Sequence, residues 1–216
     1  MRSNLGTPVA AFLLFGGTLG AVGGATAGVV PFGGADVASS WCAFDVSAYN
    51  PSTGYSDQLA FASGNPVSGP VSLFDPTYGS AACSAFGASG VTISTAFAEA
   101  AFANGAGPSI TFRQAFVVTS DVIMTWSALL PAGGGLLRID TVGGSGSLSV
   151  TYWDGANSSL TLAQSGAGEH YLISYSSFGS AIQSGTALSV SFAEVPAPGA
   201  LALLGVAGLA GSRRRR

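Results

Sequence analysis

The feature that most constrains the fold is a series of short segments in which apolar and polar residues alternate. From Trp41 onward, these segments are separated by Gly, Pro, Asn and Asp, which favour turns. Alternation with a period of two is typical of strands that have one buried face. Because no helical crossovers join the segments, the pattern predicts an all-β domain, an antiparallel β-sandwich of jelly-roll-like form.

One Ala-rich segment, residues 94–104, has the propensity to form a helix as well. Its neighbours alternate as strands do, so a strand is the preferred interpretation. The sequence Asp154-Gly155-Ala156-Asn157 is a favourable hairpin turn. The expected strands are residues 41–46, 58–61, 71–74, 91–97, 110–116, 122–126, 136–140, 148–153, 160–162, 171–175 and 187–192.

The charged residues divide between the ends and the body of the chain. Five of the seven arginines lie in the two terminal segments, and the chain contains no lysine. Residues 28–194 hold the other two arginines and all ten acidic residues, a formal net charge of −8. Because two cations neutralise few phosphates, nucleic acid is not an expected partner. This segment is long enough to form one domain with a substantial core.

Residues 1–27 have the three parts of a secretory signal peptide. Arg2 supplies the positive charge, and an apolar stretch follows over residues 9–22. Ala25 and Ala27 fit the small-x-small cleavage rule, which makes Gly28 the mature N-terminus. The alternative is an uncleaved membrane anchor, but the apolar stretch is Gly-rich and shorter than the roughly 20 residues that a span requires.

Two cysteines, Cys42 and Cys83, are consistent with export. A single pair in an exported chain predicts a disulfide, which closes a loop of about 40 residues. In the chain-entropy model such a link contributes on the order of 3–4 kcal/mol. Free thiols are one alternative, and a metal site is another that would need more ligands than the chain offers here.

No constellation of catalytic residues is evident, and an enzyme is not expected. His170 lacks a recognisable nucleophile motif, and the carboxylates are scattered singly rather than paired. Asp140 and the turn at residues 154–157 offer oxygen ligands for calcium, but neither matches a dedicated loop. No metal and no cofactor are therefore predicted.

Trp126 and Trp153 are the candidate glycan contacts in the body. Exposed aromatic faces on a β-sandwich can stack on sugars, and Trp153 directly precedes the predicted turn. The competing interpretation places both rings in the core, because aromatic side chains bury large areas and pack across strands.

The last 22 residues, 195–216, have three parts in a fixed order. Pro196 and Pro198 end the last predicted strand, because proline lacks the ladder donor. A 14-residue apolar run follows at residues 199–212. As a helix it would reach about 21 Å, short of a hydrocarbon core of about 30 Å. The terminal block, expected on the cytoplasmic side, is Arg213, Arg214, Arg215 and Arg216.

This arrangement resembles the PEP-CTERM sorting signal of Gram-negative bacteria. The resemblance rests on the motif Val195-Pro196-Ala197-Pro198, the run 201–205 and the four arginines, with Ala197 where the family has Glu. It implies recognition by an exosortase and cleavage near the proline motif. The protein would lie transiently in the inner membrane through a short C-terminal helix, and then at the cell surface or outside the cell.

These observations predict an exported, non-enzymatic β-sandwich protein of the cell surface or of an extracellular exopolysaccharide matrix. Its parts are a signal peptide (1–27), the sandwich (28–194) and the sorting signal (195–216). The alternative is a glycan-binding module that uses Trp126 and Trp153, with or without calcium. A hydrolase centred on His170 is the third hypothesis.

Overall fold

The computed structural model describes most of the body of the chain. The predicted signal peptide, Trp153, Pro196, Ala197, Pro198 and the terminal arginines lie outside the described residues. The described residues are 28–33, 38–99, 106–130, 134–143, 148–152, 156–179 and 184–195.

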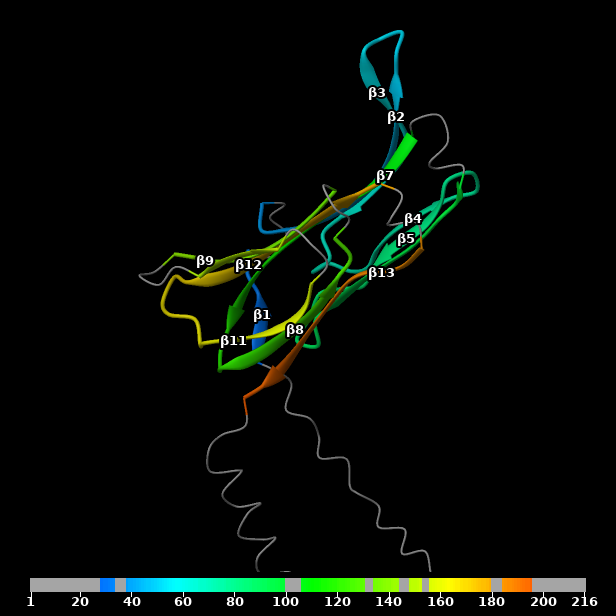
Figure 1. Ribbon diagram of the computed structural model, residues 1–216. Coiled ribbons are helices and arrows are strands. Elements are labelled where there is room, and N and C mark those ends of the chain that lie inside the picture. The colour runs from blue at the N-terminus through cyan, green and yellow to red at the C-terminus, as the bar shows by residue number, and fades with distance from the viewer. Residues whose placement is uncertain are drawn as a thin grey trace, which may run out of the picture.

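The strands form two antiparallel sheets that pack face to face as a β-sandwich (Figure 1). In sheet A the order is β10 (Ser149–Tyr152), β9 (Gly135–Val142), β12 (His170–Phe178), β7 (Ala106–Val118), β2 (Ser40–Asn50) and β3 (Tyr55–Gly64), and β1 (Val29–Pro31) also pairs with β7. In sheet B the order is β11 (Ala156–Leu162), β8 (Val122–Ala128), β13 (Ser184–Glu194), β6 (Val91–Phe97), β5 (Gly79–Cys83) and β4 (Val71–Asp75). The predicted all-β sandwich is confirmed.

The last eight strands pair in a nested pattern. Strand β6 pairs with β13 and β8 pairs with β11 in sheet B, whereas β7 pairs with β12 and β9 pairs with β10 in sheet A. The first of these eight strands, β6, therefore lies beside the last, β13. Each pair that is nested inside another lies in the sheet opposite to the pair that encloses it. Most of the pairing therefore joins residues that are far apart in the sequence.

The core lies between the two sheets and is built by the alternation that the sequence shows. Along β6 and along β8, every second side chain is buried. Phe116 of β7 contacts Phe192 of β13 across the sheets, with ring centroids 5.2 Å apart. Phe86 and Tyr171 also pack against Phe116, so one aromatic cluster joins sheet A to sheet B.

Three features differ from the sequence prediction. Strands β10 and β11, which flank the predicted hairpin turn, do not pair with each other, because β10 belongs to sheet A and β11 to sheet B. Strands β1 and β5 were not predicted, since β1 has only three residues and β5 consists mostly of small residues that show little alternation. The Ala-rich segment forms strand β6 only as far as Phe97, and residues 100–105 lie outside the described residues.

Both ends of the described body lie at the same end of the sandwich (Figure 1). The carbonyl oxygen of Gly28 accepts a hydrogen bond from the Thr119 amide at 2.6 Å. The Val195 amide donates to the carbonyl oxygen of Asp121 at 3.1 Å. The predicted signal-peptide junction and the start of the sorting motif are therefore held beside the same turn, between β7 and β8.

Candidate binding face

The outer face of sheet B is covered by small hydroxyl side chains. On β4, β6 and β8 these residues alternate with buried neighbours, so their side chains point away from the core, and pairing with Thr125 places Ser159 of β11 on the same side. We call this surface the hydroxyl strip. It consists of Ser72, Ser80, Thr92, Ser94, Thr125, Ser127, Ser159, Ser189 and Ser191.

The strand register brings these hydroxyls into rows that cross the sheet. Directly paired residues on antiparallel strands have Cβ atoms about 4.5–5.5 Å apart. Two rows are Ser159–Thr125–Ser191 and Ser127–Ser189–Thr92. With six strands about 4.8 Å apart, the strip extends about 24 Å across the sheet.

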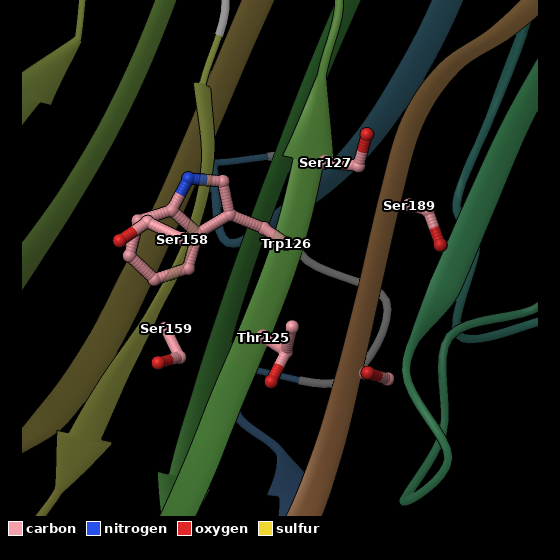
Figure 2. A pocket seen from close by; sticks show the side chains of 7 residues that line it. Thr125, Trp126, Ser127, Ser158, Ser159 and Ser189 are labelled. Carbon is pink, nitrogen blue, oxygen red and sulfur yellow. The ribbon is translucent and has the colours of Figure 1, made fainter.

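Three shallow hollows follow one another along the strip. The largest, of about 600 Å³, lies over β11, β8 and β13, where Figure 2 shows the side chains of Thr125, Ser127, Ser159 and Ser189. A hollow of about 440 Å³ continues over β13 and β6. A third, of about 320 Å³, reaches β4 and ends at Phe74, whose side chain is 82% exposed.

The chemistry of the strip is neutral and polar. None of the described residues that line these three hollows carries a charge. Each Ser or Thr hydroxyl can donate one hydrogen bond and accept others. Such a surface matches a neutral ligand with many hydroxyl groups, and Phe74 adds an exposed apolar ring at one end.

The outer face of sheet A differs in charge. Arg113 and Arg138 lie in one row across β7, β12 and β9, both opposite Ser174. The Nε of Arg138 donates to a carboxylate oxygen of Asp140 at 2.8 Å. The carboxylate of Asp45, on β2, accepts a hydrogen bond at 2.7 Å from the side-chain amide (Nε2) of Gln58, on β3 of the same sheet. These charges lie on the outer face of sheet A, whereas the described charges within the strands of sheet B lie at strand ends, at Asp75 of β4 and Glu194 of β13.

Trp126, a predicted glycan contact, borders the hollow of about 600 Å³ but is almost entirely buried. Its side chain is only 2% exposed, because β8 alternates and Trp126 faces the side opposite to Thr125 and Ser127. The indole packs on Tyr152 of sheet A, with ring centroids 5.3 Å apart, and its Nε1 has no hydrogen-bond partner. In Figure 2 the ring lies toward its paired residue Ser158 rather than toward Ser189. The indole therefore belongs to the inner side of sheet B.

The structure brings Cys42 and Cys83 together from opposite sheets. Cys42 lies on β2 and Cys83 on β5, and both side chains are fully buried. They are thiols in this structure. A hydrogen bond to Cys83, together with burial, raises the pKa of Cys42 far above its ordinary value. The predicted disulfide would therefore link sheet A to sheet B between two thiols that are already in contact.

His170 stacks on Phe32 rather than on catalytic groups. The two rings are nearly parallel, with centroids 4.2 Å apart. Its Nδ1 is buried and has no hydrogen-bond partner, and burial lowers the pKa of the imidazole. The adjacent Glu169 carboxylate accepts a hydrogen bond from the Gly166 amide at 2.9 Å. The base and its orienting acid are thus not arranged as a triad requires.

Of the calcium ligands considered from the sequence, the structure describes Asp140. Asp140 is paired with Arg138, and Asp154 lies outside the described residues. Among the residues that the structure does describe, no three His, Cys, Asp or Glu side chains are close enough to share a metal ion.

The hydroxyl strip was missed at the sequence level, although a signal for it exists. The segments around Thr125–Ser127 and Ser189–Ser191 both place hydroxyl residues at alternate positions between buried ones. By itself, such alternation predicts only the polar side of a strand. The register that aligns them across sheet B comes from tertiary structure alone.

The described part of the chain contains no apolar helix of the length that crossing a bilayer requires. Comparisons of the chain with family models, with curated proteins and with solved structures gave no match.

Proposed function

We propose that this chain is an exported, non-enzymatic component of the cell surface or of an extracellular polysaccharide matrix, and that its body binds a neutral polysaccharide along the hydroxyl strip. The observation that carries the binding proposal is the run of three uncharged hollows across sheet B. An elongated surface of hydroxyl groups suits a polymer whose repeating units present hydroxyls in turn.

The terminal segments support the export part of the proposal. The signal peptide would direct secretion, and the motif at residues 195–198, followed by the apolar run and the arginines, would direct processing by an exosortase. Because the Gly28 and Val195 backbones bond to the same turn, both cleavage events would occur at one end of the folded body. The outer face of sheet B extends away from that turn along the sandwich.

We also infer that the sandwich is a jelly roll. The nested pairing of β6 with β13, β7 with β12, β8 with β11 and β9 with β10 supports this assignment. An arrangement of this kind is a long antiparallel hairpin rolled so that successive pairs alternate between two sheets.

A matched pair of isosteric substitutions tests the strip. Thr125→Val removes one strip hydroxyl from β8, and Thr111→Val removes a hydroxyl that is also exposed, on the outer face of β7. We expect Thr125→Val, combined with Ser189→Ala and Ser191→Ala, to reduce retardation in gels that contain dextran by at least threefold. Thr111→Val should leave retardation unchanged.

The probes for this experiment are dextran, mannan and, as an acidic comparison, alginate. Equal retardation of the strip variant and the unmodified protein in the two neutral gels would contradict the binding proposal. Retardation in alginate alone would point to the arginines of sheet A instead.

The sorting proposal has a separate test. Removing residues 195–216 should change where the protein accumulates, and mass spectrometry of the mature protein should find both processed ends. An unchanged distribution, or a mature protein that retains all four terminal arginines, would contradict exosortase processing.

A further inference from the structure

Strand β3 forms one edge of sheet A. It pairs with β2 over nearly its whole length and ends the strand order of the sheet. An edge strand leaves every second backbone N–H and C=O without a partner in the sheet, which makes it a template for another strand. At ten residues, β3 is longer than β4, β10 and β11, which form the other ends of the two strand orders.

The hairpin of β2 and β3 exposes large apolar side chains. Figure 1 shows this hairpin projecting beyond the rest of the sandwich. Tyr55 is 77% exposed, Phe61 48% and Leu59 37%, and Tyr49 of β2 is 60% exposed. Exposing several large apolar side chains to water on one segment is unfavourable in free energy. Patches of this kind mark interaction surfaces.

The edge also lacks most of the devices that prevent strands from associating. Strand β3 contains no Lys, Arg or Pro. Its one charged side chain, Asp57, accepts a hydrogen bond from the side-chain amide (Nδ2) of Asn50 at 2.7 Å. The register shifts at Val46/Ser47 and leaves Leu59 as a single bulged residue, which is the one protective device of this kind along the strand.

We propose that β3 is an assembly edge at which a second copy of this chain adds its own β3 in antiparallel orientation. An antiparallel pair of identical strands is related by a two-fold axis, so the same surface serves on both copies. An axis at Leu59 places Asp57 opposite Phe61 of the second copy, and the two Asp57 carboxylates do not face each other.

A second copy fits this edge better than a strongly charged partner does. Asp57 is the single charge of the strand and is already hydrogen-bonded, so the edge offers backbone groups and apolar side chains rather than a charged surface. Pairing β3 with β3 joins two A sheets into one continuous sheet. The hydroxyl strips of both copies remain uncovered, because they lie on the outer faces of the B sheets.

Light scattering coupled to size exclusion, over a hundredfold range of concentration of the exported protein, tests this proposal. We expect a dimer that dissociates on dilution. Phe61→Lys should weaken association at least tenfold, whereas Phe74→Lys, at a more exposed ring on the edge strand of sheet B, should not. A monomer at all concentrations would overturn the proposal, as would equal effects of the two variants.

Amide hydrogen exchange on the unmodified protein provides a second readout that needs no substitution. Protection of amides in residues 55–61 should rise with protein concentration, while protection in β4 and β10 should stay constant. A rise confined to β4 or to the strip would place the contact elsewhere and refute the β3 edge. Because the strip variant should still dimerise, failure of glycan binding and failure of assembly are separate outcomes.

Discussion

The outer faces of sheets A and B have the same backbone geometry but different chemistry. Both are solvent-facing sides of antiparallel sheets, opposite the same core. On sheet A the outer positions include Asp45, Arg113, Arg138 and Asp140. On sheet B the corresponding positions form the uncharged hydroxyl strip. Solubility alone does not require this separation, because either face would be kept soluble by mixed charges.

The difference teaches where information about function lies in such a fold. Inner positions are restricted by packing, so both sheets use similar apolar residues there. Outer positions are restricted much less, and a consistent choice of Ser and Thr over charged residues on six neighbouring strands therefore indicates a surface with its own chemistry. The following predictions test whether the two outer faces differ while the shared interior does not.

The largest effect is expected at the shared interior. Phe116→Ala removes the ring that joins the aromatic cluster of the two sheets, at a position with no exposed surface. We expect it to lower the free energy of unfolding by about 3–5 kcal/mol, the usual cost of truncating a buried Phe. Urea unfolding followed by Trp fluorescence measures this. A loss below 1 kcal/mol would mean that the sheets are not held together by this cluster.

The next effect concerns the predicted disulfide between the two sheets. If Cys42 and Cys83 are oxidised after export, the double variant Cys42→Ser, Cys83→Ser should lose about 3–4 kcal/mol of stability. The contact of the two buried thiols motivates this prediction. Mass spectrometry under non-reducing conditions would show whether the bond forms. An equal midpoint of unfolding with and without reductant would refute the predicted stabilising disulfide.

A smaller, pH-dependent effect is expected on the sheet A side, at His170. Burial lowers the pKa of the folded imidazole below its ordinary value near 6.5, so the unfolded chain binds the proton more readily. Stability should therefore fall as the pH drops from 7 through 6.5 toward the folded pKa. Chemical unfolding at pH 7.5 and 5.5 measures the change. His170→Gln should reduce this dependence, whereas Thr125→Val on sheet B should preserve it.

The smallest effect is expected at the ion pair on sheet A. Arg138→Ala breaks the contact with Asp140, but the Arg138 side chain is 51% exposed. Exposed pairs contribute about 0–1 kcal/mol, so thermal unfolding should change little. Retardation in dextran should also stay the same, because Arg138 lies on the face opposite to the strip. Weaker dextran binding by this variant would contradict the separation of roles between the faces.

The sequence predicted the sandwich because burial imposes a period of two on every long strand. It missed β5, where Gly79, Ser80 and Ala81 carry too little hydrophobic contrast to reveal a buried face. One glycine in the adjoining turn illustrates a further limit. Gly90 has a φ of 110°, and a Cβ there would collide with the Val190 carbonyl oxygen. That constraint arises from β13, a hundred residues later in the chain.

The candidate site was less predictable than the fold. Trp126 was selected by residue type, but its position in the alternation of β8 places it on the buried side. Residues two positions apart on a strand face the same side, and Met124 is fully buried. Trp126, two residues after Met124, therefore faces the core as well. The strip itself depends on the register between strands that are far apart in sequence, such as Ser189 beside Ser127. No local pattern contains that information.

The nested pairing has a consequence for how the protein is made. Strand β6 has β13 as a neighbour, and β13 ends at Glu194, directly before the motif that begins at Val195. High contact order slows folding, since long loops must close before their pairings form. Sheet B therefore cannot be completed until almost the whole chain is present, and under the proposed export this means until almost the whole chain has crossed the membrane. The apolar run and the arginines would then delay release for the period in which the last strand inserts, so that secretion and folding finish together.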